Sequence, residues 1–96
     1  MYRNKKILQS AKGQKCTIRS PWCNGDQSTT VAAHSNMQLH GKGKGLKAHD
    51  CFVAYACSEC HRWLDSGPER RREKEEAFFY GHSRTLLILV QSGILK

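Results

Sequence analysis

The pattern of apolar and polar positions predicts two short apolar elements separated by a loop. Residues 28–34 are rich in β-branched side chains, which favours a strand. Residues 50–56 form an apolar run that suits either a second strand or a helical turn. Between them, residues 35–48 contain alternating glycine and lysine, and glycine makes regular structure costly. We therefore expect a strand, a loop and a second short element in this order.

A helix is expected directly after the second apolar run. Ser58 is a good N-cap residue, and Glu59 places a negative charge in the first turn of the helix. The sequence Ser66-Gly67-Pro68 predicts the end of this helix, because the residue before a proline disfavours helical geometry. The pattern thus indicates two extended segments followed by a helix.

The C-terminal third of the chain also has helical character. Pro68 suits the first turn of a second helix, which continues through Tyr80. Residues 83–91 place three large aliphatic side chains on one face, and they form either a third helix or a continuation with a bend near Gly81. Gly93 predicts the C-terminal stop.

The N-terminal part of the chain has fewer structural signals. Residues 1–15 are typical of a basic arm, with one helical turn around Ile7-Leu8. Residues 16–25 predict a loop, because Pro21 and Asn24-Gly25 are turn signals. This loop would bring Cys16 back toward Cys23.

Size and charge change this picture. The 96 residues allow one domain with a thin core, and domains this small often need a metal, disulfides or a partner. The formal net charge is +8, and residues 1–20 contain no acidic residue. Because the basic residues are segregated rather than interspersed with acids, the charge favours a polyanion such as nucleic acid.

Neither a signal peptide nor a membrane span is expected. No long apolar run follows the basic N-terminus, and residues 86–90 are too few to cross a bilayer. We therefore expect a cytoplasmic protein without membrane contact. Thiols stay reduced in that compartment, and the five cysteines are an odd number, so the cysteines indicate metal binding rather than a disulfide framework.

The cysteine spacing predicts a structural zinc site. Cys57 and Cys60 form a Cys-x-x-Cys turn at the start of the expected helix, and the dipole of that helix favours thiolate. Cys16 and Cys23 are spaced more widely but are joined by a loop that can turn back. Cys51 is the alternative ligand, although its position within an apolar run suits a buried hydrophobic side chain.

Together, these motifs resemble HNH nucleases, also called ββα-metal or His-Me finger nucleases. The resemblance is carried by Ala33-His34, the glycine-rich loop ending at Asp50, and the segment Cys57-Ser-Glu-Cys-His-Arg-Trp-Leu-Asp65. The arrangement is more closely similar to a YbcO-like family of short lambdoid-prophage proteins regarded as nucleases. That family is related to a phage RecA-dependent nuclease, and the similarity extends from about Tyr2 onward.

The resemblance implies specific roles for these residues. His34 matches the general base, and His61 and Asp65 fall four positions apart on the helix that supplies ligands to a catalytic ion. Asp50 matches the central polar residue and is a further candidate ligand for this ion, which would be magnesium or manganese. Many HNH sites carry an acidic residue or a histidine directly before the base, whereas this chain has Ala33. His61 could instead orient a zinc thiolate.

DNA is the expected partner. The candidate DNA contacts are Arg3, Lys5, Lys6, Lys42, Lys44 and Lys47. The Gly/Lys loop at 41–45 would either approach phosphates or act as a flexible linker. Trp22 and Trp63 could stack on bases, but core positions are favoured in so small a domain. The helical tail would either pack over the zinc-bound layer or bind a partner, and for that layer the candidate side chains are Phe78, Phe79, Leu86, Leu87 and Val90.

We therefore expect an α+β fold, a small zinc-stapled ββα-metal domain spanning residues 1–96. It would comprise a basic arm (1–15), a zinc-bound core (16–67) and a helical tail (68–96). The expected function is a metal-dependent DNA endonuclease linked to phage recombination, with a RecA-type recombinase or a second copy of the chain as possible partners. The alternative is a non-catalytic, zinc-stabilised module that binds DNA or a recombinase.

Overall fold

The computed structural model of the chain describes residues 1–67 and 70–95. In these residues, strands β1 (Val31–His34) and β2 (Val53–Ala56) form an antiparallel sheet. Val31 lies opposite Ala56, and His34 lies opposite Val53. The remaining elements are the helices α1 (Lys5–Ser10), α2 (Ser58–Ser66) and α3 (Arg71–Gln91) and the 3-10 turns η1 (Gln27–Thr29) and η2 (Gln38–His40).

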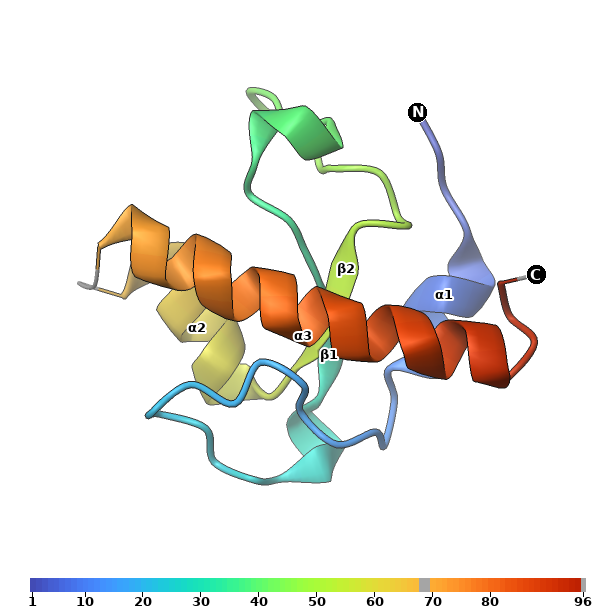
Figure 1. Cartoon of the computed structure of the whole chain (residues 1–96), viewed down its shortest axis with the longest axis horizontal. Coiled ribbons are helices and arrows are strands. Elements are labelled where there is room, and N and C mark those ends of the chain that lie inside the picture. The colour runs from blue at the N-terminus through green and yellow to red at the C-terminus, as the bar shows by residue number, and fades with distance from the viewer. Residues whose placement is uncertain (68–69, 96) are drawn as a thin grey trace.

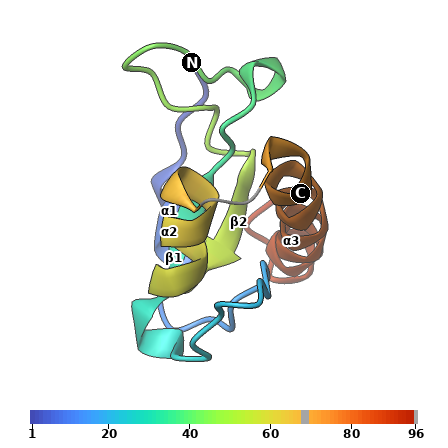
Figure 2. The same cartoon turned by 90° about the vertical axis from the view of Figure 1, so that its left-hand side faces the viewer.

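The helices cover the two sides of the small sheet. The long helix α3 crosses the hairpin and packs against β2 (Figure 1). Viewed from the side, the sheet lies between α3 and the pair α1 and α2 (Figure 2). All four residues of β2 are buried, which explains why its sequence is a continuous apolar run rather than an alternating one.

The expected α+β class and the order strand, strand, helix are confirmed, although the strands are shorter than expected. Residues 27–29 are not part of β1, because the side chain of Asp26 accepts a hydrogen bond from the backbone N–H of Ser28 and caps η1. Residues 53–56 are a strand, which decides between strand and helical turn for the second apolar run. Helix α2 is capped by Cys57 instead of Ser58, since the Cys57 Sγ atom accepts from the backbone N–H of Cys60.

Helix α3 is one continuous helix, without the bend considered at Gly81. Gly81 instead permits close packing, because a Cβ atom there would lie 2.6 Å from Cδ1 and 3.2 Å from Cα of Ile18. The expected helix start at Pro68 and Glu69 lies outside the described residues. Gly93 has a φ of 80° just after the helix, as expected for a C-terminal stop.

The expectation that the aromatic and aliphatic residues of α3 pack inward is mostly wrong. Of the five side chains proposed for this layer, only Phe78 is buried. The buried face is completed by Gly81, Thr85 and Leu89. The Thr85 hydroxyl accepts from the backbone N–H of Tyr55 and forms a hydrogen bond with Thr17, which ties the helix to β2. The opposite face leaves exposed Phe79, Leu86, Leu87 and Val90.

The basic N-terminal segment is part of the fold rather than a free arm. Ile7 of α1 is fully buried and packs with Val53 and Leu89. The side chain of Asn4 caps α1 by accepting from the N–H of Lys6. Arg3 donates to the backbone oxygens of Ala48 and Lys47, so the chain start is fixed to the loop before β2.

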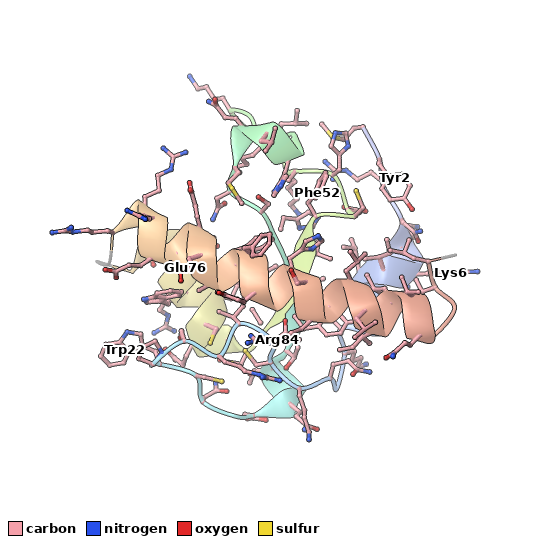
Figure 3. All side chains as sticks on the ribbon, in the orientation of Figure 1. Tyr2, Lys6, Trp22, Phe52, Glu76 and Arg84 are labelled. Carbon is pink, nitrogen blue, oxygen red and sulfur yellow. The ribbon has the colours of Figure 1, made fainter. Side chains whose placement is uncertain are left out.

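The two tryptophans differ in their environment. Trp63 is 7% exposed, in agreement with its expected core position. Trp22 is 60% exposed and extends from the loop that carries Cys23 (Figure 3), so the core prediction is wrong for this residue. In residues 1–67 and 70–95, no helix combines the length and apolar character needed to cross a bilayer.

Candidate functional site

Four cysteines from two distant segments converge at the start of α2. One sulfur atom from each residue lies within 4.8 Å of the others, and the members are Cys16, Cys23, Cys57 and Cys60. Cys57 and Cys60 are buried, whereas Cys16 and Cys23 are half-buried. Four convergent thiols are the donor set of a structural zinc site, so this cluster could hold a metal ion such as zinc. Cys51 lies outside the cluster.

Hydrogen bonding between the thiols shifts their acidity. The Cys60 thiol donates to Cys16 and lowers the pKa of Cys16 to about 4. The same bond and burial hold the pKa of Cys60 above its usual value. Burial also raises the pKa of Cys23. These opposite shifts result from packing four thiols together, and a bound cation would instead favour thiolate at each of them.

His34 and Asp50 form the second group of functional interest. The Nε2 atom of His34 lies 2.8 Å from Oδ1 of Asp50. Asp50 is 1% exposed and has two further partners: Arg3 donates to Oδ1 at 3.0 Å, and the backbone N–H of Asn4 donates to Oδ2 at 2.7 Å. Both carboxylate oxygens are therefore used within the protein, which explains how a nearly buried acid is accommodated.

The balance of these contacts keeps Asp50 ionised. Burial acts to raise the pKa of Asp50, but hydrogen bonds from His34, Asn4 and Arg3 outweigh it and hold the pKa below its usual value. An ionised carboxylate only accepts hydrogen bonds, so the proton in the His34 contact resides on Nε2 of the imidazole. The contact therefore fixes both the orientation and the tautomer of His34.

His34 lines a groove of about 730 Å³ together with residues from α1, the loops and α2. His61 and Asp65 lie on this groove, as their spacing on α2 predicts. The Nε2 atom of His61 is 3.3 Å from Oδ2 of Asp65, and Asn36 donates to Oδ1 of Asp65 at 3.1 Å. His61 thus pairs with an acid of its own helix, which does not support the alternative in which it orients a zinc thiolate.

The three residues expected to hold a catalytic ion are not gathered in one place. Asp50 is engaged with His34 and the N-terminal segment. Among the described residues, the four cysteines are the one group of three or more candidate ligands whose donor atoms converge. His61 and Asp65 lie together on the groove, whereas Asp50 contacts His34.

Part of the expected DNA-binding set lies on the groove. Lys42 and Lys47 line it, whereas Lys5, Lys6 and Lys44 are on the surface elsewhere. Arg3 holds Asp50 and the loop, so its main contacts are within the protein.

Two further residues on the groove were missed from the sequence. Lys12 lines the groove from the segment after α1, and Asn36 holds Asp65. Lys12 belongs to the basic N-terminal cluster, but nothing in its spacing distinguished it from its neighbours. Asn36 lies two positions after His34, and this was the only signal for it.

The fold and the site define a small α+β protein that carries a four-cysteine cluster able to hold a metal ion, next to a basic groove lined by histidines. The chain belongs to the YbcO family: the family model described as "Putative nuclease YbcO" matches residues 5–94. A solved structure from Escherichia coli str. K-12 substr. MG1655, described as a "putative bacteriophage protein", is similar with a TM-score of 0.71 and 28% identity. The match covers 90% of this chain and 98% of that chain. No curated protein sequence matches significantly.

Proposed function

We propose that the protein is a metal-dependent DNA endonuclease of the HNH class, with His34 as the general base. The observation that carries the proposal is the placement of His34, fixed by Asp50, on the same groove as His61 and Asp65. The order β1, β2, α2 and membership of the YbcO nuclease family support it.

The tautomer of His34 determines its chemistry. With the proton on Nε2 and directed at Asp50, the other ring nitrogen, Nδ1, is a hydrogen-bond acceptor. Within residues 1–67 and 70–95, no protein group bonds to this nitrogen. Nδ1 can therefore take a proton from a water molecule as that water attacks the phosphorus atom. Asp50 stabilises the imidazolium that forms, because its negative charge is 2.8 Å away.

The rest of the groove would bind the substrate. Lys12, Lys42 and Lys47 place positive charge where the phosphates of a DNA strand would lie. Asn36 fixes the rotamer of Asp65, and Asp65 in turn holds His61. A magnesium or manganese ion held by His61 and Asp65 would supply Lewis-acid stabilisation of the leaving oxygen when bound.

The cysteine cluster has a structural role in this proposal. Cys16, Cys23, Cys57 and Cys60 would hold a zinc ion that joins the N-terminal loop to the start of α2. Helix α2 also carries His61 and Asp65, so the same link would hold one wall of the groove.

The test is nicking of a supercoiled plasmid with magnesium or manganese. The wild-type protein should nick the plasmid, His34→Ala should lose the activity, and His49→Gln, which alters a histidine off the groove, should retain it. DNA binding by all three proteins without cleavage under either ion would overturn the nuclease proposal. That result would favour a non-catalytic DNA-binding module.

We also propose that α3 binds a protein partner, either a RecA-type recombinase or a second copy. The observation that favours this role is the exposed apolar face formed by Phe79, Leu86, Leu87 and Val90. Leu87→Glu should abolish recombinase-dependent stimulation of nicking or self-association in light scattering. Gln38→Glu, which adds the same charge at an exposed position on η2 and away from α3, serves as the control. Identical behaviour of wild type and Leu87→Glu in both assays would exclude this face as a binding surface for a protein partner.

A further inference from the structure

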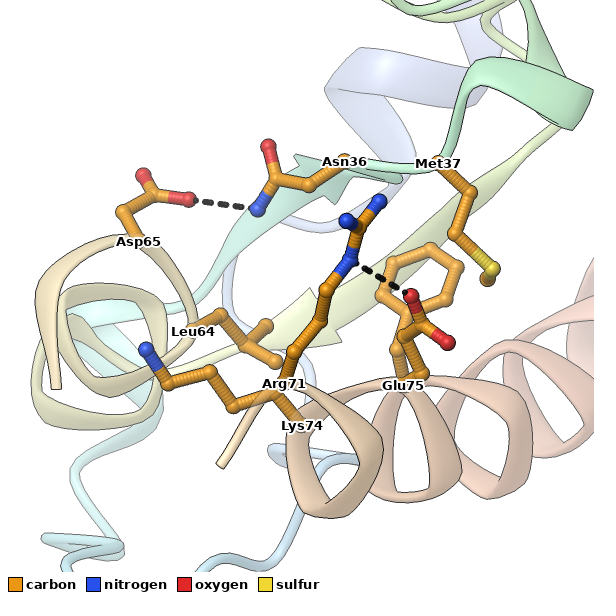
Figure 4. A pocket seen from close by; sticks show the side chains of 8 residues that line it. Asn36, Met37, Leu64, Asp65, Arg71, Lys74 and Glu75 are labelled. Carbon is orange, nitrogen blue, oxygen red and sulfur yellow. Dashed lines mark hydrogen bonds and ion pairs between the residues drawn. The ribbon is translucent and has the colours of Figure 1, made fainter. Parts of the chain in front are cut away.

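A second cavity continues from the groove. It has a volume of about 320 Å³ and lies between α2, the first turns of α3 and the segment after β1 (Figure 4). Asn36 and Asp65 line both the groove and this cavity. We propose that the cavity binds one unpaired nucleobase next to the scissile phosphate, which makes single-stranded or locally unwound DNA the substrate. The reference to a scissile phosphate rests on the nuclease function proposed above.

The floor of the cavity is apolar. Leu64 and Phe78 are almost completely buried and present only part of their surface to it. Met37, which is half-buried, packs against the same cluster and completes the floor. The flat apolar faces of a nucleobase suit such a surface, and the volume lies in the range of roughly 300–1,000 Å³ typical of small-ligand sites.

Polar groups surround this floor, as the edge of a base requires. Asn36 uses one amide hydrogen on Asp65, which leaves its second hydrogen and its carbonyl oxygen for a base edge. Glu75 accepts from Nε of Arg71 at 3.0 Å, and its carboxylate has further capacity to accept from an N–H group on the edge of a base. Amide and carboxylate side chains are the groups that distinguish bases by their edges.

The guanidinium group of Arg71 at the rim is available for a phosphate. Arg71 has a side chain that is 79% exposed, and its contact with Glu75 uses only Nε. Lys74 is different, because its Nζ atom donates to the backbone oxygen of Gly67 and so fixes the end of α2. Arg71 is therefore positioned to contact the phosphate of the nucleotide whose base enters the cavity.

The enclosed geometry selects for an unpaired base. In a duplex, the faces of a base are stacked and its pairing edge is occupied, so neither can reach an apolar floor between two helices. Extruding a base from a duplex costs a few kcal/mol, whereas an unpaired base enters without that cost. Single-stranded DNA should therefore bind more tightly than duplex of the same length.

The two methionines of the chain provide a direct test. They are Met1 and Met37, so a spectrum of protein labelled with ¹³C at the methionine methyls contains one signal from the cavity and one from the chain start. The experiment uses the full-length His34→Ala protein, so that the DNA probe is not cleaved during the measurement. The probe is an oligothymidylate of about 12 nucleotides, compared with an abasic strand of the same length and charge. The Met37 methyl should shift upfield with the oligothymidylate and not with the abasic strand, while Met1 should not move with either.

A paired substitution tests the rim. Arg71→Gln should weaken oligothymidylate binding about 3- to 10-fold more than Arg72→Gln, which removes the same charge from the neighbouring position but does not line the cavity. An unmoved Met37 methyl at saturation, or equal shifts with the abasic strand, would overturn the base site. If the Met37 shift is present but the wild-type protein nicks no plasmid, the base site stands and the nuclease proposal fails.

Discussion

Nε2 of His34 lies 2.8 Å from Oδ1 of Asp50, and this pair is the centre of the proposed catalytic site. The same Oδ1 accepts from Arg3, and Oδ2 accepts from the backbone of Asn4. The N-terminal segment, the loop before β2 and the end of β1 are thus joined at one buried carboxylate. The orientation of the histidine therefore depends on residues at the start of the chain.

Asp50→Asn should keep a side chain of the same size beside His34 but remove the charge that fixes the tautomer of His34. The amide retains the size of the side chain, but it no longer requires the proton on Nε2, so a fraction of His34 would present the wrong nitrogen to water. We expect plasmid nicking to fall roughly 10²–10⁴-fold, because losing an orienting carboxylate has effects of this order in triad enzymes. Affinity for DNA, measured by anisotropy, should change less than about 3-fold. A parallel loss of affinity and rate would instead indicate general misfolding.

Asp50 also predicts how stability depends on pH. Its pKa is lower in the folded protein than its ordinary value of 3.8, because the hydrogen bonds from His34, Asn4 and Arg3 outweigh burial. The carboxylate therefore contributes stability above its unfolded pKa, and this contribution is lost as the pH falls through its folded pKa. Urea unfolding at several pH values should show Asp50→Asn destabilised by about 2–3 kcal/mol at pH 7. The difference between the two proteins should shrink below about pH 4. If the difference in unfolding free energy between wild type and Asp50→Asn stayed constant down to pH 2, the ionisation of Asp50 would not contribute to stability.

The cysteine cluster predicts one zinc ion per chain. Elemental analysis should find zinc in wild type and Cys51→Ser but little in Cys57→Ser, since Cys51 lies outside the cluster. Chelation should lower the melting temperature of wild type and leave that of Cys57→Ser unchanged, because metal binding and folding are coupled. Wild-type protein without zinc and with unchanged melting after chelation would exclude the structural role.

Short-range signals predicted the local elements well. The Cys-x-x-Cys turn, the helix after it and the apolar run of β2 all depend on neighbouring residues, and their positions were close to those observed. The closeness of Cys16 and Cys23 to Cys57 and Cys60 was also predicted from the sequence, because a Cys-x-x-Cys turn needs a second pair of ligands, although Cys51 remained an alternative.

Relationships between distant segments could not be predicted in the same way. Asp50 was assigned to the ion with His61 and Asp65, yet its partners come from positions 3, 4 and 34. Helix α3 has apolar residues on both faces, so its sequence pattern could not show that Phe78 and Leu89 face inward while Leu87 and Val90 face solvent. The role of Gly81 likewise depends on Ile18, which is far away in the sequence.

Lysines that line the groove should contribute more to DNA binding than lysines elsewhere on the surface. Lys42→Gln and Lys47→Gln should each weaken binding to an oligonucleotide and reduce the magnitude of the slope of log K against log salt by about 1. Lys44→Gln removes the same charge from the same loop but does not line the groove, so its slope should remain close to that of wild type. Equal slopes for all three variants would show that the groove does not contact phosphates.

Alanine at Gly81 should destabilise the protein, in contrast to the usual preference of helices for alanine over glycine. Glycine to alanine within a helix normally stabilises by up to about 1 kcal/mol, but here the new Cβ atom would lie 2.6 Å from Cδ1 of Ile18. We expect Gly81→Ala to destabilise the protein by about 1–3 kcal/mol, because the helix must move away from the loop that carries Cys16. Ser83→Ala, on the exposed face of the same helix, is the control.

The double variant Gly81→Ala with Ile18→Val tests whether the contact with Ile18 causes this destabilisation. Removing Cδ1 of Ile18 relieves the shortest contact, but Cα of Ile18 at 3.2 Å remains, so recovery should be partial. A double-mutant cycle in urea should give a favourable coupling of about 0.5–2 kcal/mol between the two changes. Strict additivity would mean that the cost of Gly81→Ala arises elsewhere, and a stabilised Gly81→Ala protein would show that α3 does not approach Ile18 this closely in solution.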